Sequence, residues 1–419
     1  MIRELTIKNY KSILDHTIEL GRINVFIGEN GCGKTNILEA VAMAAAGVTD
    51  KLSVEELFNR GMRVAKPSIM RSSFPSAASE EIRLGLGFEL ESEHGDGHRT
   101  VELRVSADES PAAEVKWSEL EAPKEISINV GKGPEAQKLF DIVEQLNKGK
   151  EHTADLLKEF AAAVVSAVGS SQAKTLAQTL QTQTDRIELH ERLGAFAIYE
   201  ANSMALRGLM TMSRKMPLGI HGETLDYAIS KLKPEIWADV LERARCISWL
   251  DNIVVDVADT LKLKGHKLGQ GQSTLYFYDK FMGENNNIFS AENVNEGILH
   301  ILFYLTLFVS EGTPKVLGID NIETALNPQL CRDLMEQLAD LARKHDKQAL
   351  ITTHNPAVLD GLNLHDDDQR LFVVSRNDEG HTVTERIRFK PKVEGAQFKY
   401  KLSEMWMRGL IGGLPPERF

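Results

Sequence analysis

The sequence predicts an α/β fold, because short apolar runs of the strand type alternate with helical patterns in both halves of the chain. In the first half, the run at residues 23–27 leads through a glycine-rich turn into a helical pattern at residues 35–47. In the second half, a run that ends at Asp320 precedes a helix at residues 328–343 and a strand at residues 348–353. Uninterrupted apolar runs of this kind are typical of strands that helices cover on both faces.

The remaining segments extend this pattern, and the chain is long enough for more than one core. Strand-like patterns recur at residues 4–13, 81–91, 99–106, 113–117, 251–263, 273–280, 370–378 and 381–389. Residues 153–169 and 173–201 have the Ala-, Leu- and Gln-rich pattern of helices. We therefore expect four parts: an N-terminal lobe at residues 1–118, a helical insertion at 119–245, a C-terminal lobe at 246–390 and a C-terminal docking tail at 391–419.

The composition is that of a soluble globular protein, with 42% hydrophobic and 26% charged residues. The most apolar stretch, residues 298–309, is too short to span a bilayer, and the N-terminus lacks the apolar segment of a signal peptide. We therefore expect a cytoplasmic protein without a membrane partner. The three cysteines lack CxxC spacing, so the sequence predicts neither a disulfide framework nor a zinc site.

The net charge of −11 argues against a protein that coats nucleic acid by bulk electrostatics. One local segment, residues 386–401, is basic and carries interspersed aromatic residues. Two interpretations of it stay open: a contact to nucleic acid or to an acidic partner, or a solvated strand and linker.

The segment "GENGCGKT", residues 28–35, fits the pattern G-x-x-x-x-G-K-[ST] between a strand and a helix. In such a loop the backbone N–H groups surround phosphate oxygens, the lysine reaches the β- and γ-phosphates, and the hydroxyl of Thr35 can ligate Mg²⁺. We therefore expect ATP and Mg²⁺ as cofactors. The expected contacts to ATP are Gly28, Asn30, Gly31, Gly33, Lys34, Thr35 and Asn36.

The order of motifs resembles that of the ABC-type ATPases of the RecF, SMC and OLD group. The segment "LTIKNYKSI" followed by "INVFIGENGCGKTNILEA" is similar to the opening of these proteins. Near the other end, "VNEGILHIL" resembles their signature motif, "VLGID" the Walker B strand, "ALNP" the D-loop and "LITTHNP" the switch-histidine segment. The resemblance implies an ABC-ATPase head, in which a P-loop mixed sheet and an antiparallel β-subdomain are joined here by an inserted helical region.

The resemblance also implies roles for residues far from the phosphate loop. Asn295 and the backbone of Gly297 would donate to the γ-phosphate of an ATP held by a second copy, although the family usually has serine at the first position. Asp320 would hold Mg²⁺, and His354 would reach the γ-phosphate. The alternatives are a helix N-cap for Asn295 and an ordinary loop histidine for His354.

Two further family motifs are less clear in this sequence. Asn327 would belong to a D-loop that crosses to the partner copy, or it would simply cap the next helix. The family's Q-loop has no counterpart, because the segment at residues 58–80 contains no glutamine.

The residue after Asp320 departs from the family pattern. Where the family has "DEPE", this chain has "DNIE", so that Asn321 stands at the place of the catalytic glutamate and Glu323 at that of the second acid. An asparagine can orient a water molecule but cannot accept its proton at neutral pH. We expect weak or absent hydrolysis with intact ATP binding, and as the alternative substantial turnover through Glu323, Glu292 or Glu296.

Two functions remain open at this stage. In the first, the chain is the ATP-binding sensor and scaffold of a two-component system, similar to the ATPases of anti-phage modules such as Septu. It would form a homo-oligomer, either a dimer around ATP or a higher assembly built from such dimers. It would control a separate effector, expected to be a nuclease, because no Toprim-like nuclease follows His354. In the second, it is a RecF-like DNA-repair ATPase that binds DNA itself.

The apolar face of residues 400–415 has two interpretations as well. It is a candidate docking surface for the effector, or it packs on the chain's own core. Leu402, Met405, Trp406 and Leu410 form this face.

Overall fold

The computed structural model describes residues 1–74, 81–90, 97–108, 116–119, 189–210, 217–284, 286–388 and 401–412. Most of the helical insertion expected at 119–245, including the helix at 153–169, lies outside the described residues, as does most of the docking tail. The four-part division of the chain therefore stays a prediction.

A six-stranded sheet forms the centre of the molecule, in the order β14-β13-β3-β12-β11-β7. The strands β13, β3, β12, β11 and β7 run parallel, and β14 is antiparallel to β13. Their bounds are Ile23–Gly28 (β3), Ile198–Tyr199 (β7), Val316–Ile319 (β11), Gln348–Thr353 (β12), Gln369–Arg376 (β13) and Thr382–Ile387 (β14). Every residue of β3, β11 and β12 is buried, as expected for strands covered on both faces.

A five-stranded antiparallel sheet covers one side of the central sheet, with the helix α1 (Lys34–Val48) between them. Its order is β2-β1-β4-β5-β6, with bounds Ile2–Tyr10 (β1), Ile13–Glu19 (β2), Ile82–Leu90 (β4), Gly97–Asp108 (β5) and Lys116–Glu119 (β6). Because α1 has a sheet on both sides, it is buried along almost its whole length. The short helices α2 (Val54–Asn59) and α3 (Pro67–Met70) follow it.

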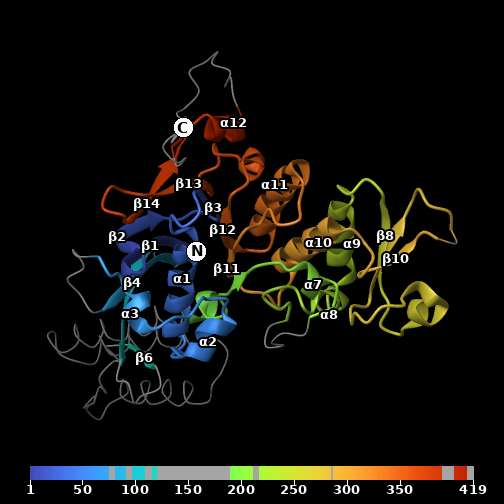
Figure 1. Ribbon diagram of the computed structural model, residues 1–419, viewed down its shortest axis with the longest axis horizontal. Helices are drawn as coiled ribbons and strands as arrows, with labels where there is room; N and C mark the ends of the chain where they lie inside the picture. Colours follow the sequence, from blue (N-terminus) through green and yellow to red (C-terminus); the bar gives the residue numbers. More distant parts are fainter. Residues whose placement is uncertain are drawn as a thin grey trace, which may run out of the picture.

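The opposite face of the central sheet packs against α10 (Glu296–Val309) and α11 (Pro328–Lys344). These two helices share a second hydrophobic core, separate from the first core around α1. Beyond α10 lies a three-stranded antiparallel sheet, in the order β10-β9-β8. Figure 1 shows this sheet on the right and the five-stranded sheet on the left, with α10 and α11 between them. The bounds are Leu250–Val255 (β8), Leu275–Asp279 (β9), Ile288–Ser290 (β10), Ser203–Leu206 (α7), Leu225–Ser230 (α8) and Pro234–Ala244 (α9).

Two sequence predictions about secondary structure are wrong in part. The helix expected at 173–201 ends near Leu193 in its described portion, and Ile198–Tyr199 is instead the strand β7 beside β11. Gly194 ends that helix, since a Cβ there would lie 2.4 Å from the carbonyl oxygen of His190. The strand expected at 251–263 ends at Val255, because the Asp256 carboxylate accepts bonds from two following backbone N–H groups and turns the chain toward the helical segment η1 (Lys262–His266).

The helix α12 (Leu402–Met407) rests on the chain's own core. Leu402 and Trp406 are buried in the second core, and the Ser403 hydroxyl donates to Asp360 at 2.8 Å, in η2 (Pro356–Gly361). Leu410 is 58% exposed. Packing on the own core is therefore confirmed for most of the apolar face. Among the described residues, no helix is long and apolar enough to cross a membrane.

Candidate functional site

The phosphate loop begins where β3 ends, at Gly28, and turns into α1. Gly33 has φ 111°, a conformation that L residues with side chains avoid, and a Cβ there would lie 2.2 Å from the Thr382 hydroxyl. Gly31 has φ 76°, and a Cβ on Gly28 would lie 2.1 Å from the carbonyl oxygen of Val374. The glycines are thus required both by backbone conformation and by close packing against β13 and β14.

A relay of hydrogen bonds fixes the loop to the β1–β2 turn and to β14. The Asn36 amide donates to the Ser12 hydroxyl at 2.7 Å, Ser12 and Thr382 are bonded at 2.7 Å, and Thr382 donates to the carbonyl of Cys32 at 2.7 Å. Because Thr382 donates to Cys32, it must accept from Ser12. The relay therefore has one donor-to-acceptor direction, and it ties the loop and the first turn of α1 to the β1–β2 turn and to β14.

Arg376 holds the tip of the loop from outside. Its Nε and Nη2 donate to the carbonyl of Gly31 at 3.2 and 3.0 Å, and its Nη1 donates to Gly380 at 2.6 Å. Sequence reasoning missed Arg376 and Thr382. Neither stands in a recognisable motif, and both meet the loop across some 345–350 residues of chain.

Lys34 begins α1 and is buried. Its Nζ donates to the carbonyls of Gly28 and Glu29 at 2.8 and 2.9 Å and lies 3.4 Å from Nδ1 of His354. Burial lowers the pKa of Lys34, with partial opposition from nearby Cys32 and from the acids Asp320 and Glu323. The positive charge of the ammonium group is therefore only weakly balanced by neighbouring negative groups. This setting favours an added anion such as phosphate.

The side chains that could ligate a divalent cation lie at the carboxyl ends of β3 and β11. Thr35 Oγ1 donates to both carboxylate oxygens of Asp320 at 3.2 and 3.1 Å, and the Thr352 hydroxyl donates to the same carboxylate. The backbone N–H of Asp320 donates to the carbonyl of Tyr199 at 2.9 Å, so that β7 helps to place it. A hydroxyl and a carboxylate are hard oxygen ligands that suit Mg²⁺.

The protein itself supplies few ligands for a metal ion. Among the described residues, no cluster of three or more His, Cys, Asp or Glu side chains could hold a metal ion on its own. The fit for Mg²⁺ at Thr35 and Asp320 therefore requires phosphate oxygens and water as the remaining ligands, as is usual for this ion.

Asn321 occupies a special backbone position. It has φ 53°, in the left-handed region where Asn is favoured over other residues with side chains. Its backbone N–H donates to Thr352 at 3.0 Å, and its carbonyl accepts two bonds from Thr324. These bonds fix the backbone of the residue that directly follows Asp320.

Glu323 is tied to the switch-histidine segment. One carboxylate oxygen accepts from the Thr353 hydroxyl at 2.8 Å, and the other accepts from the backbone N–H of His354 at 2.8 Å. Burial, followed by the charge of Lys34, lowers the pKa of His354. Glu323 thus positions His354 beside Lys34, and each of its carboxylate oxygens accepts one hydrogen bond from this segment.

The other two acids considered as substitutes for the catalytic glutamate also have partners. Glu292 accepts from the backbone N–H of Gly271 at 2.5 Å and lies 3.9 Å from the Lys267 ammonium. Glu296 accepts from the Ser203 hydroxyl at 2.8 Å. Both stand near the start of α10, in the segment that leads into it or in its first turn, where these bonds fix them locally.

Asn295 is the N-cap of α10. Its side-chain oxygen accepts from the backbone N–H of Gly297 at 2.8 Å, so this N–H, expected to face a phosphate, is already bonded. Gly297 is buried, and its N–H would have to leave the cap to meet a phosphate, so its expected contact to phosphate stays a prediction. Asn295 itself is exposed, and its side-chain NH₂ group takes no part in the cap.

Two further asparagines complete the set. Asn327 caps α11 by accepting from the backbone N–H of Leu330 at 3.0 Å, as its alternative interpretation held. Asn30 is exposed at the tip of the phosphate loop. No described glutamine supplies a Q-loop between α1 and β4.

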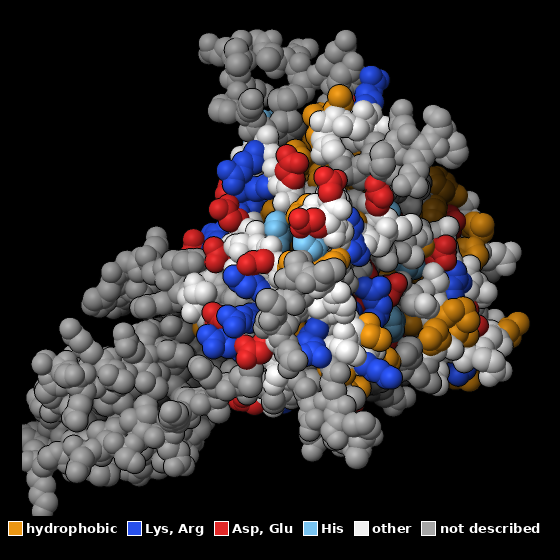
Figure 2. All heavy atoms as spheres, turned by 60° about the vertical axis from the view of Figure 1, so that its left-hand side comes forward, with side chains coloured by type: hydrophobic (Ala, Val, Ile, Leu, Met, Phe, Trp, Pro, Cys, Tyr) orange, Lys and Arg blue, Asp and Glu red, His pale blue; other side chains and the backbone are white. Residues whose placement is uncertain are grey.

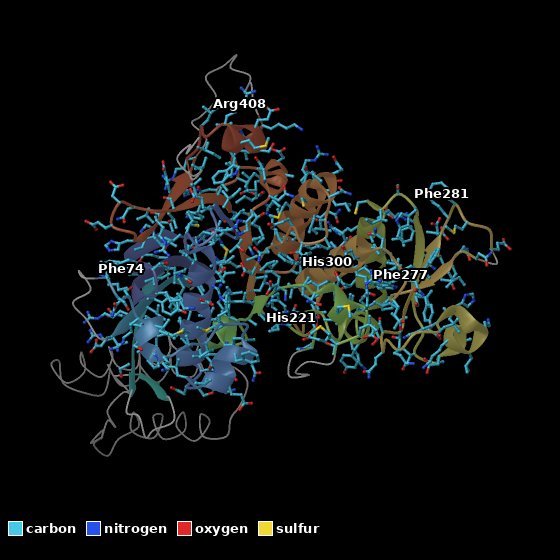
Figure 3. The ribbon with its side chains drawn as sticks, in the orientation of Figure 1. Phe74, His221, Phe277, Phe281, His300 and Arg408 are labelled. Atoms are coloured by element: carbon cyan, nitrogen blue, oxygen red, sulfur yellow. The ribbon has the colours of Figure 1, made fainter. Side chains whose placement is uncertain are left out.

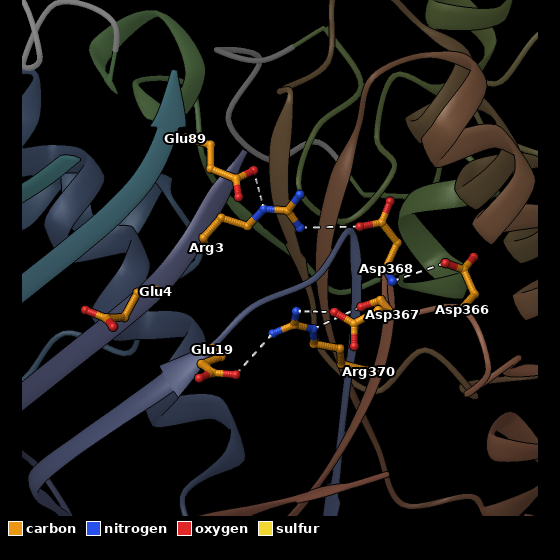
Figure 4. A pocket seen from close by; sticks show the side chains of 8 residues that line it. All are labelled: Arg3, Glu4, Glu19, Glu89, Asp366, Asp367, Asp368 and Arg370. Carbon is orange, nitrogen blue, oxygen red and sulfur yellow. Dashed lines mark hydrogen bonds and ion pairs between the residues drawn. The ribbon is translucent and has the colours of Figure 1, made fainter. Parts of the chain in front are cut away.

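Three consecutive aspartates that follow His354, namely Asp366, Asp367 and Asp368, lie elsewhere, in a charged depression of about 570 Å³ at the start of β13. Figure 4 shows Arg3 joined to Glu89 and Asp368, and Arg370 joined to Glu19 and Asp367. The depression lies near the amino ends of β3 and β13, opposite the phosphate loop. These acids form ion pairs with arginines and do not form a metal site.

Comparison with known proteins agrees with this geometry. The family model "AAA domain" matches residues 4–216, and a second model, "AAA domain, putative AbiEii toxin, Type IV TA system", matches residues 238–360. Two curated relatives are each a "DNA replication and repair protein RecF". That of Deinococcus deserti is 32% identical over 28% of this chain and 31% of its own length, and that of Deinococcus radiodurans is 33% identical over 20% and 23%. The matched segments thus span less than a third of these relatives.

Among solved structures, the chain is similar to "Crystal structure of the SmcHead bound to the C-winged helix domain of ScpA". The TM-score is 0.50 at 12% identity, and the match covers 93% of this chain and 98% of that one. At this identity the likeness concerns the fold. The α/β fold predicted from the sequence, with its mixed and antiparallel sheets, is thereby confirmed as that of an SMC head. The chain belongs to the AAA-domain family, as an ATP-binding P-loop ATPase of the RecF and SMC-head group.

Proposed function

We propose that the chain is an ATP-dependent sensor and scaffold that pairs with a second copy around ATP and Mg²⁺, hydrolyses ATP slowly and controls a separate effector, expected to be a nuclease. The observation that carries this proposal is that Asn321 follows Asp320, while Glu323, two residues further on, is hydrogen-bonded to the His354 segment. Asn321 cannot take a proton from water, and Glu323 has both carboxylate oxygens bonded to the His354 segment.

In this proposal the chain's own residues bind and orient ATP, but they accept the proton of the attacking water poorly. Lys34 and the loop N–H groups hold the phosphates, Thr35 and Asp320 hold Mg²⁺, and His354 contacts the terminal phosphate. Bound Mg²⁺ supplies charge neutralisation at the phosphates. Without a general base, a contribution of typically 10²–10⁴-fold to the rate is missing, so the ATP-bound state lasts long.

The pairing of two copies is supported by the position of Asn295. It is exposed at the start of α10, in the segment that resembles a signature motif, and its amide retains donors after capping the helix. A phosphate of the ATP held by a second copy would accept hydrogen bonds from these donors. The single-chain alternative is an ATPase that works as a monomer.

The association with defence is supported by the second family model, whose description includes a putative toxin of a toxin–antitoxin system. The similar SMC head is bound to a domain of ScpA, so that head docks a separate protein. We propose that this chain, too, has a role in defence and docks a separate protein, the effector. A cytoplasmic location is part of it as well.

The test compares the wild type with Lys34→Ala. We expect the wild type to double its mass in light scattering when ATP and Mg²⁺ are added, and to co-purify with the product of a neighbouring gene only under these conditions. Lys8→Ala, which removes an exposed lysine paired with Asp15, is the matched control. Equal mass with and without ATP in the wild type would refute the pairing.

A second candidate function is DNA binding in the manner of RecF, supported by the two curated relatives. The surface charge favours it less. On the face drawn in Figure 2, the described Lys and Arg side chains alternate with Asp and Glu, and neither sign forms a continuous patch. In the basic C-terminal segment, Arg386 and Arg388 pair with Glu19. Salt-dependent DNA binding by the purified chain would favour the RecF-like function.

A further inference from the structure

We infer that Thr352 is a positioning residue for Mg²⁺, because its hydroxyl sets which oxygen of the Asp320 carboxylate is free to ligate the ion. The inference rests on the proposed binding of ATP and Mg²⁺ and deepens it. Thr352 lies in β12, which stands in the central sheet between β3 and β11. The phosphate loop follows the first of these neighbours, and Asp320 follows the second. Thr352 is therefore on the strand that separates the two halves of the site.

Three hydrogen bonds join Thr352 to consecutive residues after β11. The regular pairing of β11 with β12 ends one residue before Thr352. The hydroxyl of Thr352 donates to Oδ1 of Asp320 and accepts from the backbone N–H of Asn321 at 3.0 Å. Its carbonyl accepts from the backbone N–H of Ile322 at 3.3 Å. One residue thus holds the whole segment that carries the expected metal ligand and the substituted catalytic position.

The direction of the two bonds at the hydroxyl follows from their partners. A backbone N–H can only donate and an ionised carboxylate can only accept, so the single hydroxyl proton of Thr352 goes to Asp320. A hydrogen bond to an ionised carboxylate is roughly twice as strong as one between neutral groups. Thr352 is fully buried, so water does not compete for this proton. The hydroxyl therefore holds the carboxylate in one orientation.

This bond makes the two oxygens of Asp320 different from each other. Thr35 donates to Oδ1 and Oδ2 at 3.2 and 3.1 Å, so it does not separate one oxygen from the other. Thr352 contacts Oδ1 alone. Among the described residues, Oδ2 accepts only from Thr35. Oδ2 is therefore the oxygen that is left for Mg²⁺ or for a water molecule bound to it.

The neighbouring hydroxyl serves a different acid. Thr353 donates to Glu323 at 2.8 Å, and Glu323 in turn accepts from the backbone N–H of His354. The two adjacent threonines thus divide the site between them, one for Asp320 and one for the histidine segment. Removal of the Thr352 hydroxyl leaves the bonds of Glu323 in place, so its effect on Mg²⁺ can be measured separately.

The test measures ATP affinity by isothermal titration calorimetry, once with excess Mg²⁺ and once with EDTA, and takes the ratio of the two affinities as the Mg²⁺ gain. Thr352→Val keeps the shape of the side chain but has no hydroxyl. We expect it to reduce the Mg²⁺ gain by roughly 10- to 100-fold, the usual cost of losing a group that orients a metal ligand. The affinity in EDTA should stay that of the wild type. Thr352→Ser keeps the hydroxyl and should retain the gain.

The matched control is Thr306→Val in α10, the helix on which Figure 3 labels His300. Thr306 is also fully buried, and its hydroxyl has no hydrogen-bond partner among the described residues. The control makes the same chemical change without touching Asp320, so the gain should be unchanged. A wild-type gain in Thr352→Val would overturn the inference, as would an equal loss of ATP affinity with Mg²⁺ and with EDTA or an equal loss of gain in the control.

Thr352→Cys covers the case in which Thr352→Val does not fold, because a thiol can still accept from Asn321 but is a weak donor. We expect its Mg²⁺ gain to fall below that of the wild type, and an undiminished gain would overturn the inference. If the wild type bound ATP equally well with Mg²⁺ and with EDTA, the proposed Mg²⁺ site would fail, and the inference with it. A wild type that bound no ATP at all would refute the proposed ATP binding itself.

Discussion

The phosphate loop and the start of α10 are both expected to contact phosphate, yet they are built differently. The loop is fixed by long-range bonds from Ser12, Arg376 and Thr382, which come from the two ends of the chain. At the start of α10 the bonds of Asn295 are local, to its own helix. The first region is assembled within one chain, whereas the second keeps exposed amide donors for which the described part of the chain supplies no acceptor.

We expect this difference to divide the work between the two copies of the proposed pair. A preassembled loop can bind ATP in the single chain, since its glycines, lysine and hydroxyl already converge. Asn295 caps its own helix through its side-chain oxygen, and we expect its amide N–H groups to bind a group from the second copy. Binding and pairing should therefore be separable by mutation, and the following predictions test that separation.

The largest effect is expected for Lys34→Ala. Loss of one charge-assisted contact to phosphate should weaken ATP binding by about 10- to 150-fold, and pairing should be lost with it. Calorimetry with ATP and Mg²⁺ measures the affinity. Unchanged affinity would mean that the loop, despite its geometry, does not hold the phosphates.

A similar effect on pairing alone is expected for Asn295→Asp. Aspartate caps a helix as well as asparagine does, so the free energy of unfolding should stay within about 0.5 kcal/mol of wild type. Its carboxylate has no donors and repels phosphate, so ATP-dependent association should weaken by more than about tenfold. Asn295→Ser, which keeps both the cap and a donor, should retain association.

The contrary result for this pair is informative. If Asn295→Asp paired as well as the wild type in light scattering, Asn295 would be a helix cap and nothing more. The start of α10 would then have no role in binding phosphate.

A smaller effect is expected for Thr382→Val, which removes the hydroxyl that donates to Cys32. Because Thr382 is 2% exposed, the orphaned carbonyl and the broken relay should lower the free energy of unfolding by about 1–3 kcal/mol. Denaturant unfolding measures this loss. Thr17→Val, whose exposed hydroxyl pairs only with Thr6, should change it by less than about 0.5 kcal/mol.

The smallest effect concerns pH. Burial, and then the charge of Lys34, lowers the pKa of His354, so its ring is neutral at pH 7 without nucleotide. A phosphate near the ring would raise that pKa again, and binding would then take up a proton as the pH falls toward 6. ATP affinity should rise by a factor of about two to ten between pH 7.5 and 6.0 in the wild type, relative to His354→Gln.

The same titration of His354→Gln controls for the ionisation of ATP itself. Other charges facing His354 are Lys34, Glu323 and Asp320, all of which remain in the variant. Parallel affinity curves for the two proteins would place His354 away from the terminal phosphate.

The sequence was sufficient for the parts of the molecule that depend on local patterns. The central strands, α1, α10 and α11 follow from apolar runs and caps, and the α/β fold was predicted correctly. The strand β7 was missed because two residues, Ile198 and Tyr199, form a strand only when β11 lies beside them. The end of β8 was missed because the Asp256 side chain, rather than a Gly or Pro signal, turns the chain.

For the site, the sequence identified the residues that belong to motifs but not the bonds between distant segments. Lys34, Thr35, Asp320 and His354 lie together in the structure. Arg376 and Thr382 carry no motif, and their contacts to the loop arise only from the folding of β13 and β14 beside β3. The roles of these residues in catalysis remain proposals that the variants test.

The central claim is that Asn321 makes the chain a slow ATPase. Steady-state turnover tests it most directly, with Asn321→Gln as the control, since Gln meets the same left-handed backbone strain as Glu but cannot accept a proton. We expect wild-type turnover below about 1 s⁻¹. Asn321→Glu should raise it on the order of 100-fold, and Asn321→Gln should not. A wild type that turns over at about 1 s⁻¹ or faster, with activity lost in Glu323→Gln and unchanged in Asn321→Glu, would contradict the account.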